Sequence, residues 1–326
     1  MNAATKNRFY FLILFVLFAL CFLIDTFKGY SFFVSELSSS ELFLINQFRL
    51  PKAITAVITG AGLSLAGLLL QGLFRNPLVG PYVLGISSGA SLGVSLFIVT
   101  GSSFTGFVLA EFGLSMAAIL GSVLMLMLIL FFSRFLSGKV SLLLVGLMIG
   151  QLAGALQSLL DFLANPNELK SVLLWNMGSL ENVGWDKQSY FLPITCALIC
   201  VSVLLIKPLD ALLLGDDYAT NLGVRVKRIR FFLLAISGTL TGMITAMCGP
   251  IAFVGIAVPH ICRLLFSTSR HVILMPAVLL CGSLFMLLSD ILSNFSNEFH
   301  LPVNVITSLI GVPVIIALIV KTRNLY

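Results

Sequence analysis

The sequence predicts an all-α membrane protein with about ten transmembrane helices, and three observations support this prediction. Of the 326 residues, 59% are hydrophobic and only 10% are charged, whereas a soluble domain has about 25% charged residues. The apolar residues form long runs, most of them close to the roughly 20 residues that a helix needs to cross a bilayer. These runs neither alternate nor have the half-length of barrel strands. A soluble globular domain and a disordered chain are therefore excluded.

The apolar segments comprise nine of full length and a short one. The full-length segments cover residues 9–27, 53–73, 82–100, 114–133, 140–164, 190–206, 231–248, 272–293 and 303–320. The short segment, residues 251–266, contains Pro259, which we expect to break it. The first segment follows Lys6 and Arg8 and exceeds the about 7–15 apolar residues of a signal peptide. We therefore expect it to be a retained helix.

The basic residues predict the orientation of these segments. With ten spans and a cytoplasmic N-terminus, fourteen of the 19 Lys and Arg residues fall in cytoplasmic segments and five fall outside. This asymmetry follows the positive-inside rule, so both termini are expected in the cytoplasm. The net charge of +6 then reports topology and indicates membrane lipid, not nucleic acid, as the surroundings. We expect one membrane domain over residues 1–326.

Glycines at four-residue spacing predict close packing between helices, with a stripe that lines a transport path as the alternative. The glycines occur in three groups: Gly85, Gly89 and Gly93; Gly146, Gly150 and Gly154; Gly238 and Gly242. The chain is also interrupted at Arg75–Pro81 and at Cys248–Pro250, each time after a long helix and before a shorter apolar segment. This weak internal symmetry is typical of inverted-repeat transporters.

The sequence contains no recognisable energy source of its own. Its membrane carboxylates, Asp25, Asp161 and Asp290, fall towards the outer ends of their spans, whereas ion-coupled carriers usually have an ionisable group near the midplane. No G-x-x-x-x-G-K-[ST] phosphate loop occurs, and His260, His271 and His300 lack metal-ligand spacing. We expect no cofactor, no metal and no catalytic site. The alternatives are a gradient-driven carrier that acts alone and a membrane enzyme.

The long loop at about residues 207–230 is the predicted docking site for a soluble polypeptide that supplies energy. Apolar side chains recur on one helical face at Leu214, Tyr218 and Leu222. Asp216 and Asp217 suit the first turn of a helix, and Gly223 suits its end. A helix that lies on lipid headgroups usually carries Lys and Arg, so the acidic polar face favours a groove on a protein partner.

Several ordered motifs along nearly the whole chain resemble those of one transporter family. They are Arg49-Leu50-Pro51-Lys52, the run Gln71–Leu78 with Leu84–Ala90, the loop Leu214–Val224, the segment Gly249–Gly255 with Pro259, His260 and Arg263, and Leu301–Val303 with Gly311–Pro313. These motifs resemble the permease subunits of bacterial ATP-binding cassette (ABC) importers for vitamin B12, iron-siderophores and haem, the FecCD/BtuC type.

The resemblance implies a BtuC-like inverted repeat that works as a homodimer, with a translocation path on the two-fold axis. It also implies two copies of an ATPase subunit that hold the loop through Leu214, Gly215, Asp216, Asp217, Tyr218, Ala219, Leu222, Gly223 and Val224. Structural or pathway roles fall to Gln71, Asn76, Pro77, Gly85, Gly89, Gly93, Gly255 and Pro259. A heterodimer with a paralogous permease stays open.

A substrate-binding protein is expected to dock on the outer face, at Arg49 and Lys52. Two residues depart from the family pattern. Asn294 stands where a basic residue is frequent and would weaken one docking contact, and Asn304 stands within the usual P-[IV]-G. The resemblance implies an iron-siderophore or haem as cargo, with vitamin B12 as the alternative, and no residue decides between them.

Overall fold

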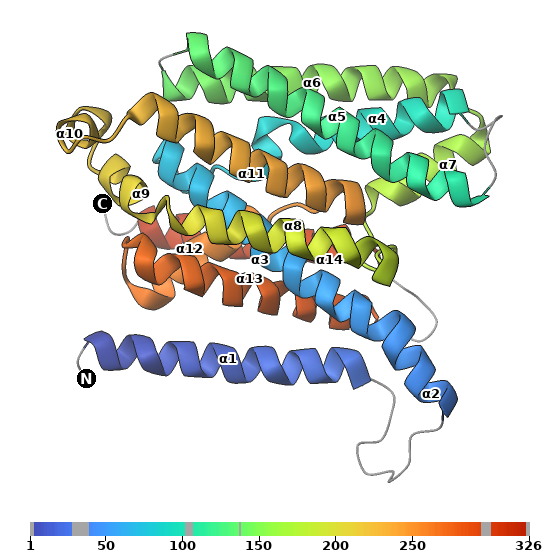
Figure 1. Cartoon of the computed structure of the whole chain (residues 1–326), viewed down its shortest axis with the longest axis horizontal. Helices are drawn as coiled ribbons and strands as arrows, with labels where there is room; N and C mark the ends of the chain where they lie inside the picture. The colour runs from blue at the N-terminus through green and yellow to red at the C-terminus, as the bar shows by residue number, and fades with distance from the viewer. Residues whose placement is uncertain (1–2, 28–38, 102–106, 137, 295–300, 324–326) are drawn as a thin grey trace.

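The computed structural model describes residues 3–27, 39–101, 107–136, 138–294 and 301–323, and helices account for nearly all of them (Figure 1). The elements are α1 (Ala3–Phe27), α2 (Ser39–Leu44), the π-helix η1 (Ile45–Arg49), α3 (Leu50–Phe74), the 3₁₀-helix η2 (Pro81–Leu84), α4 (Ile86–Gly101), α5 (Phe107–Phe135), α6 (Lys139–Leu163), α7 (Pro166–Asn176), α8 (Trp185–Val203), α9 (Ile206–Leu213), α10 (Asp216–Asn221), α11 (Val226–Cys248), α12 (Val254–Phe266), α13 (His271–Ser293) and α14 (Val303–Arg323).

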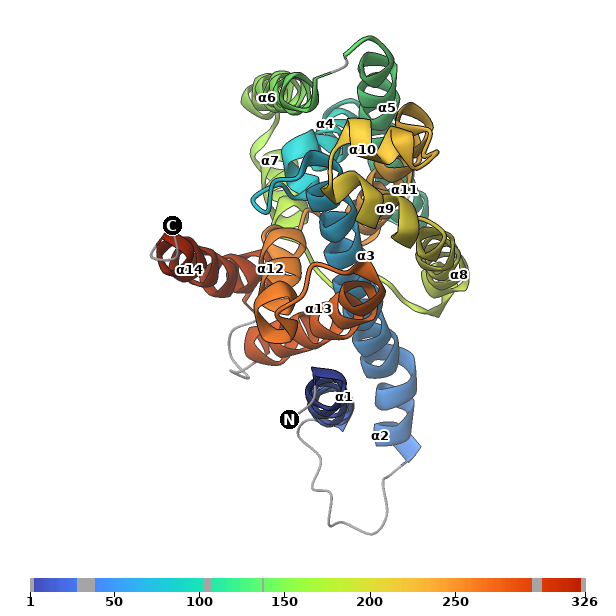
Figure 2. The same cartoon turned by 90° about the vertical axis from the view of Figure 1, so that its left-hand side faces the viewer.

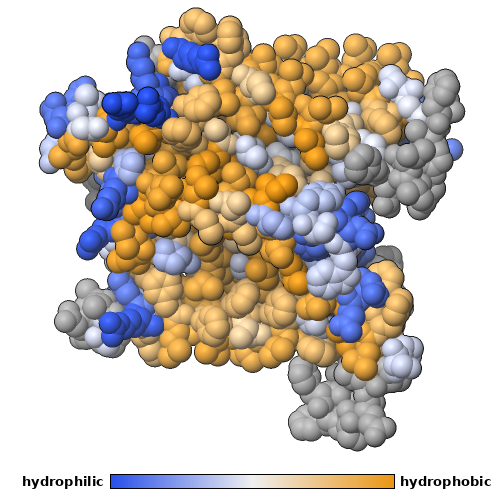
Figure 3. All heavy atoms as spheres, viewed as in Figure 1, coloured by the Kyte–Doolittle hydropathy of each residue, from blue (hydrophilic) through white to orange (hydrophobic). Residues whose placement is uncertain are grey.

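Each of the ten predicted apolar segments corresponds to a helix, which confirms the predicted fold class. Six helical segments in the described residues are long and apolar enough to cross a membrane, and α8 with α9 makes a seventh if this bent pair is one span. The helices α4, α12 and α14 are apolar but shorter. Apolar side chains cover most of the visible surface (Figure 3). The chain is therefore a multi-pass membrane protein.

Helix α3 lies at the centre of the bundle and is buried along nearly all of its length. It packs against α13, α11 and α12, while α4 packs against α5 and α1 packs against α13 (Figures 1 and 2). Glycines outside the three predicted groups permit these close approaches. A Cβ atom at Gly67 would lie 1.8 Å from the carbonyl oxygen of Gly255 in α12, and one at Gly60 would lie 2.1 Å from that of Gly282 in α13. The core therefore requires glycine at these crossings.

The two predicted breaks lie at opposite ends of the bundle. Helix α3 ends at Arg75, which has a left-handed backbone with φ of 50°, and α11 ends at Gly249, with φ of 74°. Helices α3 and α11 run in opposite directions (Figure 1), and each break is followed by a shorter helix, α4 after the first and α12 after the second. This arrangement agrees with the predicted inverted repeat.

The two ends of the bundle are formed by different helices. One end carries α9 and α10, the start of α1 and the end of α14 (Figure 1), and we refer to it as the α10 end. The opposite end carries α2, α7 and the last turns of α1, α6 and α13. Asp25, Asp161 and Asp290 lie in those last turns, as predicted. The two ends of the described chain thus share one end of the bundle.

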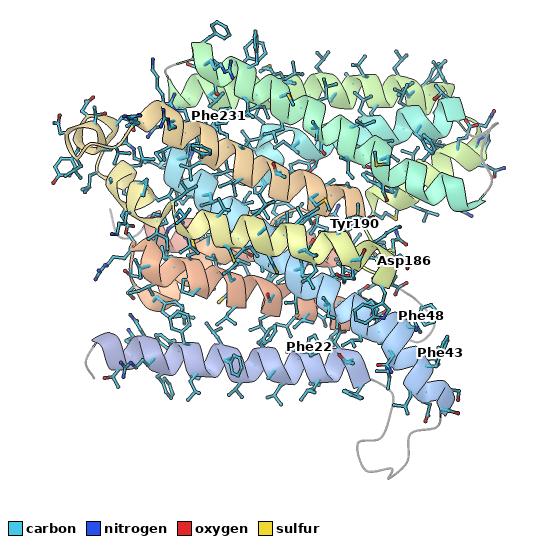
Figure 4. All side chains as sticks on the ribbon, viewed as in Figure 1. Phe22, Phe43, Phe48, Asp186, Tyr190 and Phe231 are labelled. Carbon is cyan, nitrogen blue, oxygen red and sulfur yellow. The ribbon has the colours of Figure 1, made fainter. Side chains whose placement is uncertain are left out.

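Several helix boundaries differ from the prediction. The segment predicted at 53–73 begins at Ser39 and is continuous to Phe74. It includes a π-turn just before Pro51, whose missing N–H prevents regular α-helical hydrogen bonding there. Phe43 and Phe48 are exposed on this extension (Figure 4). The segment predicted at 82–100 begins within the 3₁₀-helix η2 and is α-helical only from Ile86, because Gly85 between them has φ of 72°.

Three further details of the prediction were incomplete or wrong. Pro259 lies inside α12 without breaking it, and the interruption comes earlier, at residues 249–253. The segment predicted at 190–206 is α8, which ends at Val203, and a bend of 53° separates it from α9. Helix α7 was not predicted, although Asn165 and Glu168 form a capping box at its start.

Candidate coupling and translocation sites

The α9–α10 segment (Ile206–Asn221) lies at one end of the main helix bundle (Figure 1). Leu209 and Leu212 are fully buried and fix α9 to the bundle, where the Leu209 side chain approaches Gly72 of α3. Gly215, with φ of 126°, separates α9 from α10, and Gly223, with φ of 83°, follows α10. The predicted short helix and its glycine terminator are thus present.

A single carboxylate, Asp216, connects the α9–α10 segment to three transmembrane helices. Its oxygen Oδ1 lies 3.0 Å from Nη2 of Arg75, which ends α3, and 2.8 Å from Nζ of Lys139, which begins α6. Its oxygen Oδ2 lies 3.5 Å from Nη2 of Arg230 in α11. We call these four residues the Asp216 cluster. The cluster fixes the position of α10 relative to both halves of the chain.

The electrostatics of the cluster keep Asp216 ionised. Partial burial would raise the pKa of Asp216, but hydrogen bonds and charge contacts with Lys139 and Arg75 outweigh that effect and lower the pKa below its usual value. Arg230 also donates from Nη1 to the backbone oxygen of Leu136, at 3.2 Å, at the end of α5. Asp216 is therefore ionised in its ion pairs at neutral pH, and the hydrogen bond from Arg230 connects the cluster to the end of a fourth helix, α5.

Helix α9 has a second polar connection, to α13. The carboxylate oxygen Oδ1 of Asp210 accepts a hydrogen bond from the backbone N–H of His271 at 2.9 Å and lies 2.6 Å from its ring Nδ1. His271 is the first residue of α13 and its side chain is buried. A carboxylate at this position also interacts favourably with the positive end of the helix dipole. Asp210 and Asp216 together link the α9–α10 segment to α3, α6, α11 and α13.

The polar contacts leave one face of the α9–α10 segment uncovered. Its apolar side chains, Leu214, Tyr218 and Leu222, are all exposed. The single helix predicted to carry them is not formed, because Gly215, with φ of 126°, separates Leu214 from α10, which ends at Asn221. Asp217 is exposed as well, whereas Ala219 is buried and Val224 is half-buried. An exposed apolar face on a short helix that is anchored by ion pairs suits a contact with another protein.

A cavity of about 440 Å³ lies between α4, α6 and the start of α14. Its lining includes Ser87, Ser88 and Ser91 of α4, Gln151 and Gln157 of α6, and Asn304. Every polar side chain that the described residues contribute to the lining is neutral, and none of these residues is Asp, Glu, Lys, Arg or His. The wall can therefore donate and accept hydrogen bonds without imposing a charge. Only 22% of the residues in the apolar stretch of α6 are buried, so this helix borders the cavity from the surface of the chain.

The residues with predicted structural or pathway roles fall into two groups. Gly85 lines the cavity, where a Cβ atom would lie 2.6 Å from Cα of Gly150. The others pack helices together or shape a turn. Gly89 and Gly93 closely approach the α5 backbone, Gly255 approaches Pro81, and Pro259 is buried in α12. The structure therefore supports the packing interpretation for most of the predicted glycines.

Gln71, Asn76 and Pro77 lie around the end of α3. Gln71 is buried, donates from Nε2 to the backbone oxygen of Ile256 at 3.3 Å and accepts a hydrogen bond from Arg263. Asn76 and Pro77 are exposed in the turn after α3, where Oδ1 of Asn76 accepts a hydrogen bond from the N–H of Leu78 at 3.0 Å. Gln71 thus joins α3 to α12, and Asn76 shapes the turn.

The residues with a predicted docking role lie at the end opposite α10. Lys52 is largely buried, and its Nζ lies 2.9 Å from Oε1 of Glu181 and 3.2 Å from Oδ1 of Asp290. Asn294 donates from Nδ2 to the backbone oxygen of Asp290 at 2.8 Å. Arg49 is half-exposed at the end of η1. Lys52 and Asn294 therefore meet at the same buried aspartate, a contact that the sequence did not reveal.

Within the described parts of the chain, no group of three His, Cys, Asp or Glu side chains could hold a metal ion. His260 is half-buried in α12, and His271 pairs with Asp210. His300 lies outside the described residues. The histidines therefore contribute no metal site to the part of the molecule that the structure describes.

Sequence reasoning missed the partners of Asp210 and Asp216. The available signal was the scarcity of acidic residues on the predicted cytoplasmic side, where three aspartates face fourteen basic residues. Such isolated carboxylates are expected to have basic neighbours. Sequence alone did not show which basic residues these are, because Arg75, Lys139 and Arg230 come from three separate helices.

Comparison with known proteins places this arrangement in context. A family model described as the FecCD transport family matches residues 9–321. The chain is 35% identical over 294 residues to the molybdate import system permease protein MolB of Haemophilus influenzae, covering 89% of this chain and 84% of that protein. It is 37% identical over 282 residues to the hemin transport system permease protein HmuU of Yersinia pestis, covering 85% and 83%.

A solved structure shows the same fold. It is an ABC transporter in an inward-facing conformation, assigned by its description to the metal-chelate type, and it is 32% identical in sequence with a TM-score of 0.87. The match covers 95% of this chain and 98% of that one.

Proposed function

Because the chain belongs to the FecCD transport family and is therefore the permease subunit of an ABC importer, we propose that it carries a metal chelate, an iron-siderophore or haem, across the cytoplasmic membrane. The neutral hydrogen-bonding cavity between α4, α6 and α14 is the observation that carries this proposal. A chelate arrives with its metal already coordinated, so its path needs shape and weak polar contacts. Charged groups or metal ligands in the wall would retain the cargo.

The proposed energy source is a separate ATPase subunit, which contacts the α9–α10 segment from the cytoplasm. The exposed face of Leu214, Tyr218 and Leu222 supplies the contact. The Asp216 cluster and the Asp210–His271 pair then transmit the displacement to four transmembrane helices. The α10 end is accordingly cytoplasmic, as the excess of basic residues on that side predicts.

The proposed assembly is a homodimer in which a second copy completes the path. The cavity lies beside α6, most of which is exposed, and α14 lies on the same side of the molecule (Figure 2). A copy related by two-fold symmetry would place its own α6 and α14 opposite these helices. The path would then run between the subunits.

A substrate-binding protein is proposed to dock at the end opposite α10, on Arg49 and Lys52. Lys52 already pairs with Glu181, whose side chain is 59% exposed. An acidic side chain of the binding protein can therefore replace Glu181 at the surface while Asp290 retains its contact with the lysine. Exchange of rim charges of this kind mainly affects the rate and orientation of docking.

Transport in proteoliposomes tests the proposal. The permease is reconstituted with its ATPase subunit and binding protein and is offered a ferric siderophore, haem, cobalamin and molybdate in turn. We expect ATP-dependent accumulation of one of the first two compounds. A proton or sodium gradient without ATP is expected to drive no uptake. Accumulation of cobalamin or molybdate alone would overturn the proposed cargo, and gradient-driven uptake by the permease alone would overturn the proposed energy source.

A further inference from the structure

A second cavity, of about 900 Å³, lies at the α10 end, where α5 ends and α11 begins. Basic side chains dominate its polar lining: Arg134, Arg225, Lys227, Arg228 and Arg230. Its apolar side chains are Phe135, Leu136, Val224, Val226 and Phe231. Figure 4 shows Phe231 near the start of α11. The cavity therefore combines a cationic rim with an apolar wall.

The charges around this cavity are not balanced within the described chain. Asp216 is the only acidic residue in the lining, and it already pairs with Arg75, Lys139 and Arg230. The first turn of α11 contains no acidic residue, so the positive end of its helix dipole adds to the basic side chains. An anion in the cavity would relieve this repulsion.

The position of the cavity defines the kind of anion. Arg134 lies in the last turn of the spanning helix α5, and Val226 is the first residue of the spanning helix α11, so the cavity is at the membrane boundary. Phe131, Phe135 and Phe232 are exposed beside it. A soluble anion uses none of these aromatic side chains, whereas the acyl chains of a lipid pack against them.

We propose that this cavity binds the headgroup of an anionic phospholipid, with its phosphate among Arg134, Arg225, Lys227 and Arg228 and its acyl chains along α5 and α11. The site is distinct from the neutral cavity proposed for the cargo, and its occupancy does not depend on the substrate. A bound lipid would fill the space beside the Asp216 cluster and compensate the charge that Asp216 leaves unpaired.

Native mass spectrometry of the full-length chain in detergent tests this proposal. The protein is offered phosphatidylglycerol and phosphatidylcholine with identical acyl chains, and the ratio of the two adducts is measured. The site variant carries Arg134→Gln, Arg225→Gln, Lys227→Gln and Arg228→Gln. The control variant carries Lys6→Gln, Arg8→Gln, Lys207→Gln and Arg270→Gln, which remove the same charge from exposed positions outside the cavity.

We expect the wild-type chain and the control variant to prefer phosphatidylglycerol, and the site variant to lose this preference. The loss should be about fivefold for each cation that contacts the phosphate, since a basic side chain at a membrane surface contributes about that factor. A variant with Arg134→Lys, Arg225→Lys and Arg228→Lys keeps the charge and should retain the preference. If the fourfold variant is not monodisperse, the single variant Arg228→Gln provides the same comparison.

Four results would overturn the proposal. Equal preference in the site variant and the wild-type chain would exclude the cavity as the lipid site. Equal loss in the control variant would show that only the net charge matters. Displacement of phosphatidylglycerol by millimolar inorganic phosphate would assign the cavity to a soluble anion. An unchanged lipid preference with lost affinity for the ATPase subunit would assign the cations to protein docking, which also contradicts the proposal.

Discussion

Asp216 is an acidic side chain at the meeting point of three helix ends. Its carboxylate contacts a cation at the end of α3, at the start of α6 and in the second turn of α11. The adjacent Asp217 has the same chemistry but is exposed on the other side of α10 from the buried Ala219. The two neighbours therefore provide a matched pair for separating the structural contact from the local charge.

We predict that Asp216→Asn reduces ATP-dependent uptake several-fold, and that Asp217→Asn, which leaves the Asp216 cluster intact, reduces uptake less. The ion pairs are partly exposed and screened, so the stability lost should be only about 1 kcal/mol. Uptake and the thermal midpoint should be measured on the same preparations. If both variants lose uptake equally, the acidic charge of the helix matters and the contacts of Asp216 do not.

The pKa of Asp216 sets the pH range of this contact. Because the pKa is lowered in the folded chain, the stabilisation is complete above the ordinary aspartate pKa of about 4 and disappears as the pH falls through the lowered value. Neutral and mildly acidic conditions therefore leave the cluster intact.

Residue types at the α9–α10 segment were predictable from the sequence, whereas their contacts were not. The exposure of Leu214, Tyr218 and Leu222 and the helix end before Gly223 follow from local sequence, and the structure shows both. The single helical face predicted for these three side chains is not formed, because Gly215 separates Leu214 from α10. The pairing of Asp210 with His271 depends on where α9 turns after the bend of 53°. No local pattern encodes that direction.

At the scale of the helices, glycine determines how closely α3 and α12 can pack. A Cβ atom at Gly67 would overlap the backbone oxygen of Gly255, and a backbone atom cannot move aside as a flexible side chain can. Gly154 in α6 has no atom within 4 Å of the position of an added Cβ. The same substitution, glycine to alanine, at these two positions therefore compares a tightly packed site with an open one.

We predict that Gly67→Ala destabilises the chain by about 3 kcal/mol or more, because the two helices must separate. Gly154→Ala should leave stability unchanged or raise it by up to about 1 kcal/mol, since alanine favours the helix. Thermal unfolding in detergent measures both effects. A similar midpoint for the two variants would contradict the close packing of α3 on α12.

Hydropathy predicted the presence of each membrane helix. It could do so because the bilayer itself requires an apolar segment of sufficient length. It failed at boundaries that other forces set. Pro51 lies within a continuous helix because a π-turn accommodates it, and Pro259 lies in α12 because the chain had already broken at Gly249. A proline alone does not identify where a helix ends.

For the whole molecule, the neutral cavity beside α6 predicts the orientation of two copies. Gln151 lines this cavity and is exposed, whereas Leu120 is exposed on α5, away from it. In a background in which the exposed Cys196 and Cys200 are replaced by serine, we predict that Gln151→Cys forms dimers with a bifunctional maleimide in membranes. The dimer band on a denaturing gel measures the reaction.

Leu120→Cys is the control for random collision and should remain monomeric under the same treatment. Equal cross-linking at both positions would indicate collision in the membrane. Cross-linking at Leu120→Cys alone would place α5 between the two copies and would contradict the proposed position of the path.

The fastening of the α9–α10 segment to α3, α6, α11 and α13 restricts the motions available to this protein. Helices from both halves of the chain are held together at the α10 end of the bundle. A force applied there therefore tilts these helices together and does not slide one helix past another. A small tilt of these helices at the α10 end displaces their opposite ends by a larger distance, in proportion to helix length. The transmembrane helices can thus stay straight while the width of the proposed path changes at the end opposite α10.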